Sequence, residues 1–164
     1  MGTKASQYAE WIELHNFADN LIDLSGWKIV EGGSGATVVT LIGSIQANGY
    51  FLIERVTQSS PHAFADVIAD VSGSFGGSGL SNTGEQLILQ DSGGNAVDVV
   101  DGSSAWLNKG TASPDYKSME RINPNISGSD SNNWSSSDGI YRHGLDAKGN
   151  PINGTPRAKN SVQI

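Results

Sequence analysis

Two carboxylates that lie close together in the sequence are the first candidates for acid–base chemistry. Glu10 and Glu13 flank Trp11 in the segment Glu10-Trp11-Ile12-Glu13. Residues three apart on a β-strand point to opposite faces, so the two cannot form a paired-carboxylate site without a bulge. We interpret each as a charge at a strand edge. The alternative is that one of them is buried and hydrogen-bonded to a neighbouring loop.

The histidines and serines do not define a nucleophilic site. His15, His62 and His143 are far apart in a chain that has 22 Ser and 11 Asp, so a chance Ser-His-Asp combination is easy to draw. The sequence has no G-x-S-x-G elbow, no P-loop and no H-E-x-x-H pair. We therefore predict no catalytic residues and a protein that is not an enzyme.

Oxygen ligands of the kind that Ca²⁺ uses occur near one predicted hairpin and in the C-terminal segment. Turn chemistry explains Asp91 and Asn95, and Asp98 and Asp101 face opposite sides of a regular strand. The C-terminal carboxylates considered are Asp130, Asp138 and Asp146. A chain with no Cys also has no thiolate zinc site and no iron–sulfur cluster. We predict no metal site and no cofactor.

The aromatic residues divide into core candidates and loop candidates. Trp27 and Phe51 alternate with polar residues, which predicts core positions, and Trp11 is expected beneath a loop or the C-terminal segment. Trp106 and Trp134 lie in polar loops. Each is either a stacking platform for a sugar or protein partner or a plug that anchors its loop.

The elements that must position these residues are strands, because the hydrophobic pattern has period two nearly everywhere. We expect strands at 9–16, 27–31, 37–42, 50–55, 67–71, 85–89, 96–100 and 118–122, with Ala47-Asn48-Gly49 as the strongest hairpin signal. No segment of ten residues sustains helical periodicity. Short strands separated by turns predict an all-β, antiparallel β-sandwich.

Composition bounds the partners and the domain organisation. The chain has 164 residues, 21 Gly and a formal charge of −7, which disfavours nucleic acid, and no apolar run reaches the ~20 residues of a membrane span. The Ser-, Gly- and Asn-rich composition suits an extracellular or cell-envelope protein, although the first ten residues lack the apolar core of a signal peptide.

The C-terminal segment is more polar than the rest of the chain. We predict a sandwich over 1–122 and a polar extension over 123–164 that wraps the same domain. Its expected anchors are Trp134, Ile140, Tyr141 and Leu145. The alternative is a linker to a further domain.

An ordered set of motifs covers nearly the whole chain and resembles the lamin tail domain family, in particular its bacterial members. The matching segments are 10–16, 22–27, 49–55, 79–85, 87–91, 94–98, 118–121, 154–156 and 160–161. The first two read EWIELHN and IDLSGW. The resemblance implies an immunoglobulin-like sandwich of about 7–9 strands with no catalytic residues. In animals such domains end the tails of nuclear intermediate filaments and bind proteins and chromatin. In bacteria they occur in exported multidomain proteins.

The chain departs from the family pattern at its N-terminus, where members usually carry a strand resembling I-N-E-[IV]. Without it a neighbouring strand would expose unpaired main-chain groups, which makes that edge a candidate for dimerisation or domain exchange. We predict a non-enzymatic binding or adhesion module of a larger, exported bacterial protein, with a protein or glycan partner at its loops and edges. The alternatives are a structural spacer and an accessory nucleic-acid-binding domain of a fused nuclease.

Overall fold

The computed structural model describes residues 2–58 and 62–164, and within them the regular secondary structure is almost entirely β-strand, joined by turns and loops. The strands are β1 (Trp11–His15), β2 (Ile22–Asp23), β3 (Lys28–Glu31), β4 (Thr37–Thr40), β5 (Ser44–Ile45), β6 (Tyr50–Arg55), β7 (Val71–Gly73), β8 (Gln86–Gln90), β9 (Ala96–Asp101), β10 (Met119–Arg121) and β11 (Trp134–Ser136). Two 3₁₀ turns, η1 (Ala105–Asn108) and η2 (Ser131–Asn133), complete the described elements. Neither has the length or apolar character to cross a membrane.

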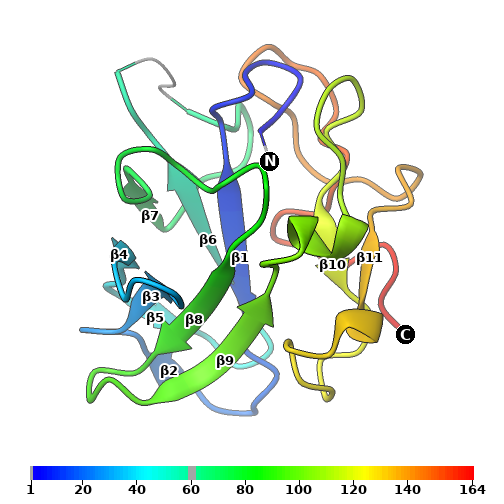
Figure 1. The fold of residues 1–164 in the computed structure, drawn as a ribbon. Helices are drawn as coiled ribbons and strands as arrows, with labels where there is room; N and C mark the ends of the chain where they lie inside the picture. The colour runs from blue at the N-terminus through cyan, green and yellow to red at the C-terminus, as the bar shows by residue number, and fades with distance from the viewer. Residues whose placement is uncertain (1, 59–61) are drawn as a thin grey trace.

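Two larger sheets form the sandwich (Figure 1). One has the antiparallel order β4-β3-β8-β9, and the other has the order β1-β6-β7. Two short pairs, β2-β5 and β10-β11, lie beside them. The predicted immunoglobulin-like β-sandwich is confirmed. The described chain has more strands than the expected 7–9, because short strands form these side pairs. One pairing departs from the expected antiparallel direction, since β7 is parallel to β6.

The main core lies between the two larger sheets, where alternate residues of each strand meet. Ile12 and Leu14 of β1 pack against it from one sheet, and Ile29 and Leu87 are buried in it from the other. Burial of these side chains is the dominant favourable term for the sandwich. Phe51 is buried as predicted, whereas Trp27 is only partly buried at the margin of this core.

A second core covers the opposite face of the β1-β6 pair. Leu52 is completely buried there, beside Ala9 and Ile152. Trp11 meets Phe64 edge-on, with 5.8 Å between ring centroids, and packs on the core that includes Ile152. A loop and the C-terminal segment, the two covers predicted for Trp11, thus both contribute. Both faces of β6 are therefore buried, which explains why YFLIER is nearly continuous in apolar residues.

Of the four expected anchors of the C-terminal segment, Trp134 is half-buried and stacks on Arg121, and the other three are exposed. Ile140 is 87% exposed and Tyr141 53% exposed, so neither pins the segment. Leu145 is also exposed, and the buried apolar contact comes from Ile152 instead. The division at residue 122 stays a prediction, and β10 and β11 pair across it.

The turn at 47–49 forms, but the strands on either side of it do not make a hairpin. Asn48 has φ 55°, and Gly49 N–H donates to the Gln46 carbonyl. However, β5 pairs with β2 and β6 pairs with β1. The turn therefore transfers the chain from one pair to another.

Candidate functional site

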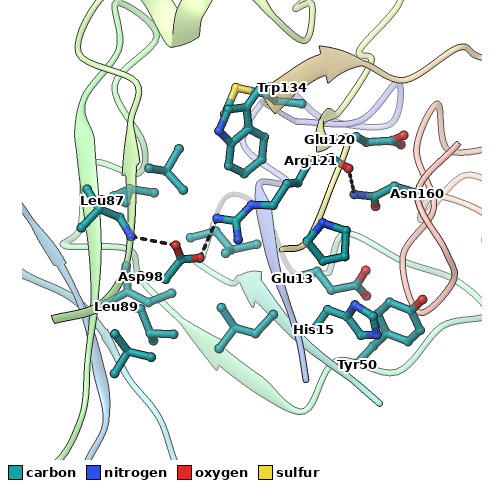
Figure 2. A pocket seen from close by; sticks show the side chains of 18 of the residues that line it. Glu13, His15, Tyr50, Leu87, Leu89, Asp98, Glu120, Arg121, Trp134 and Asn160 are labelled. Carbon is teal, nitrogen blue, oxygen red and sulfur yellow. Dashed lines mark hydrogen bonds and ion pairs between the residues drawn. The ribbon is translucent and has the colours of Figure 1, made fainter. Parts of the chain in front are cut away.

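A groove of about 850 Å³ runs along the edge of β1 and separates it from β9 and β10 (Figure 2). It extends toward the core of the sandwich, and most of its wall is apolar. Its apolar lining includes Ile12, Leu14, Leu87, Leu89, Val99 and Met119. This volume lies within the range of about 300–1,000 Å³ that is typical of ligand sites.

An ion pair spans the groove from β9 to β10. Arg121 Nη2 lies 2.6 Å from Asp98 Oδ2, and the guanidinium carbon lies 5.0 Å from the centre of the Trp134 ring. Figure 2 shows the Arg121 side chain reaching toward Asp98 beneath Trp134. Asp98 points into the groove because it is paired with Leu89, whose side chain packs against the main core. This carboxylate, considered above as a calcium ligand, instead neutralises an arginine.

Glu13 lies on the opposite wall of the groove. Its Oε2 accepts a hydrogen bond from the Arg157 main-chain N–H at 2.5 Å. Burial raises the pKa of Glu13 to about 8, against the lowering effects of this hydrogen bond and of the Arg157 charge. The Arg157 guanidinium itself is 2.6 Å from Asp70 and bonded to the Ile68 carbonyl. The Glu13 carboxylate therefore lacks a direct ion pair with it.

Glu10 lies on the other face of the chain, as the spacing of three residues predicts. Its Oε2 lies 3.1 Å from Arg55 Nη1 and accepts a hydrogen bond from Leu80 N–H at 3.1 Å. Burial raises the pKa of Glu10, while the Leu80 hydrogen bond and the Arg55 charge act in the opposite direction. Both glutamates are thus hydrogen-bonded to other segments, and neither is a simple edge charge.

A row of aromatic rings borders the groove beside Glu13. The His15 ring stacks on Tyr50 with 4.5 Å between centroids and meets Phe17 edge-on at 5.1 Å. Burial lowers the pKa of His15, and Phe17 is 47% exposed. Tyr50 and Phe17 were not predicted as site residues from the sequence. The signal that could have found Tyr50 is the β1-β6 register, which places it opposite His15.

The other histidines are used in separate contacts. His62 Nδ1 is 2.9 Å from Glu54 Oε1, and His143 Nδ1 is 2.6 Å from the Pro156 carbonyl oxygen. The described residues contain no group of three or more His, Asp or Glu side chains arranged to hold a metal ion.

The remaining candidate calcium ligands organise turns. Asp91 and Asp146 accept hydrogen bonds from Asn95 and Asn150, respectively, each four residues further on. Asp101 accepts from Ser103. Asp130 accepts from Asn132 N–H and Asp138 from Ile140 N–H in the same local manner. Such Asx turns are a sufficient structural role for these carboxylates.

Both tryptophans expected in loops are anchored by hydrogen bonds, although Trp134 begins strand β11 and does not lie in a loop. Trp106 Nε1–H donates to the Ser81 carbonyl at 2.7 Å, and its ring packs against the main core. Trp134 Nε1–H donates to the Gly128 carbonyl at 2.8 Å. Of the two roles left open by the sequence, the geometry supports the plug for Trp106. Trp134 is anchored as well, but its ring also lines the groove.

The comparisons with known proteins agree with the fold. The family model described as Lamin Tail Domain matches residues 1–103. No curated protein and no solved structure matches the chain. The matched region contains β1 to β9, and hence both larger sheets of the immunoglobulin-like sandwich. Domains of this family are generally non-catalytic. The chain belongs to the lamin tail domain family.

Proposed function

We propose that this chain is a non-enzymatic binding module of a larger, exported bacterial protein and that it engages a protein or glycan partner through its loops and edges. The observation that carries the proposal is the groove along β1, which combines an apolar wall, an aromatic rim and a buried carboxylate. The Ser-, Gly- and Asn-rich composition supports export.

The aromatic rim favours recognition over a purely structural spacer. A spacer has no need of a solvent-exposed ring, whereas exposed Phe17 and half-buried Tyr50 both contact the His15 ring at one end of the groove. Rings of this kind supply large contact areas at interfaces.

Charge argues against the nucleic-acid alternative. The formal charge is −7, and the arginine in the groove, Arg121, is already paired with Asp98. A phosphate backbone entering here would approach Glu13 and Glu120, which is unfavourable.

A thermal-shift panel tests the proposal with bacterial and plant glycans, extended peptides and short duplex DNA. A ligand at about 100 times its Kd should stabilise the chain by roughly 2.7 kcal/mol. The matched variants are Val97→Lys, which alters an exposed residue of the groove, and Ile140→Lys, which alters an exposed residue elsewhere. A glycan or peptide shift that Val97→Lys abolishes and Ile140→Lys preserves supports the proposal. No shift with any glycan or peptide overturns it in favour of the spacer.

A further inference from the structure

We propose that the groove accepts an extended peptide as an additional antiparallel strand on β1, with a lysine or arginine opposite Glu13 and an apolar residue on each side of that cation. This inference rests on the proposed function. It narrows the partner to a protein segment with the alternation apolar–basic–apolar.

The hydrogen-bonding pattern of β1 identifies the unused edge. Asn16 N–H donates to the Gly49 carbonyl, and Arg55 N–H donates to the Glu10 carbonyl. In an antiparallel ladder the groups that face one neighbour belong to alternate residues. The even-numbered residues of β1 therefore bond to β6, and the main-chain groups of Trp11, Glu13 and His15 point the other way.

These outward groups have no strand beside them in the described chain. Among the strands of residues 2–58 and 62–164, β1 pairs with β6 alone, and no main-chain hydrogen bond to the outward N–H or C=O groups joins it to another segment. The same edge borders the groove. An unpaired edge beside an open apolar groove is the arrangement that accepts an added strand.

The alternation of β1 determines which side chains such a strand would carry. Ile12 and Leu14 face the main core, whereas Glu13 lies on the other face. A cross-strand partner lies on the same face as the residue opposite it, with about 5 Å between Cβ atoms. Residues opposite Ile12 and Leu14 would thus enter the apolar part of the groove, and the residue between them would lie beside Glu13.

The charge of the groove selects a cation for that middle position. Asp98 is neutralised by Arg121, and buried Glu120 accepts hydrogen bonds from Ser118 and Ser161. Within the described residues the Glu13 carboxylate receives one hydrogen bond, from Arg157 N–H, and burial raises its pKa to about 8. A lysine ammonium or arginine guanidinium at this place would favour the ionised form of Glu13 and form an ion pair with it.

The test uses the full chain and a capped peptide Ser-Thr-Val-Lys-Val-Thr-Ser, followed by ¹⁵N-resolved NMR titration. We expect the largest amide shifts at Trp11, Glu13 and His15. Replacing the peptide lysine by glutamate should weaken binding at least about tenfold, and Glu13→Lys should restore binding of the glutamate peptide.

Methylated peptides give a second test that does not depend on any variant folding. Methylation of the lysine main-chain nitrogen removes a donor that faces β1 and should weaken binding about tenfold. Methylation of either valine nitrogen, which faces away from β1, should change the Kd less than about twofold.

The outcomes separate this inference from the proposed function. A glycan that binds in the groove while the peptide does not overturns the inference and leaves the proposed function in place. The inference is also overturned if the peptide binds but its Kd changes neither when lysine is replaced by glutamate nor with the position of the methyl group. The same holds for concentration-dependent dimerisation that blocks the peptide, because the occupant is then a second copy. No binding by any ligand overturns both.

Discussion

The two carboxylates of the first strand have opposite surroundings although only three residues separate them. Around Glu10 the fold is closed, and Arg55, with 8% of its side chain exposed, supplies both a charge and a hydrogen bond. Around Glu13 the fold is open to a groove, and the contact is a single main-chain N–H. Burial raises the pKa of both groups. The closed region pairs its carboxylate with an arginine, whereas in the open region no cation among the described residues forms an ion pair with the carboxylate.

The largest expected effect on stability comes from removing the ion pair of the closed region around Glu10. Arg55→Met leaves Glu10 buried without its cation and should lower the free energy of unfolding by about 3–5 kcal/mol, measured by urea denaturation. The double variant with Glu10→Gln should recover part of this loss. A loss below about 1 kcal/mol would show that the pair is not the main support of this region.

A glycine packed against the same pair gives the next effect. A Cβ at Gly79 would lie 2.3 Å from Glu10 Oε2 and 2.5 Å from Arg55 Nη1, at φ +84°. Gly79→Ala should therefore cost about 3 kcal/mol. Gly77→Ala is the matched control, because it has a similar φ of +90° and no atom within 4 Å of its Cβ. It should cost about 1 kcal/mol, and equal losses would contradict the steric explanation.

The next prediction concerns the open region around Glu13 and the pH dependence of the free energy of unfolding. The folded pKa of Glu13 is about 8, above the ordinary value of 4.5. Between these values the folded chain binds more protons than the unfolded chain, so stability falls as pH rises. Glu13→Gln should remove a decline of about 2 kcal/mol between pH 5 and pH 8, a figure reduced because the side chain is partly solvated. Urea denaturation of the unmodified chain and of the variant at pH 5 and pH 8 measures this decline. An equal decline in both proteins would contradict the prediction.

The smallest effect concerns the ion pair that crosses the groove. Asp98 is more than a third exposed, so a double-mutant cycle with Asp98→Asn and Arg121→Gln should give a coupling of about 0.5 kcal/mol. Added salt at about 0.5 M should reduce it. A coupling energy above about 2 kcal/mol would contradict this expectation and show that the ion pair is a strong link between β9 and β10.

Periodicity predicted the parts of the fold that depend on local pattern. Alternation in 9–16 and 50–55 predicted β1 and β6 and the opposed faces of Glu10 and Glu13. The family motifs indicated the sandwich. The strand expected at 67–71 was misplaced, because the strand found there, β7, occupies Val71–Gly73. It pairs with β6 in the parallel direction, and so short a run carries no measurable alternation.

The groove could not be predicted, because it depends on contacts between distant residues. Arg157 meets Glu13 across 144 positions, and no sequence period encodes that pairing. The anchors of the C-terminal segment were misplaced for a related reason. Hydrophobicity favoured Ile140 and Tyr141, whereas polar contacts and the position of the second core selected Ile152.

The second core also sets the order in which the chain can fold during synthesis. It joins Ala9, Leu52 and Phe64 to Ile152, so part of the outer face of β6 stays uncovered until the C-terminal segment has been made. At a translation rate of about 5–20 residues per second, the interval between Leu52 and Ile152 is on the order of ten seconds. During that time the chain displays an apolar strand face beside an unpaired β1 edge. We therefore expect the nascent chain to bind chaperones, and this exposure to end only when Ile152 has emerged from the ribosome.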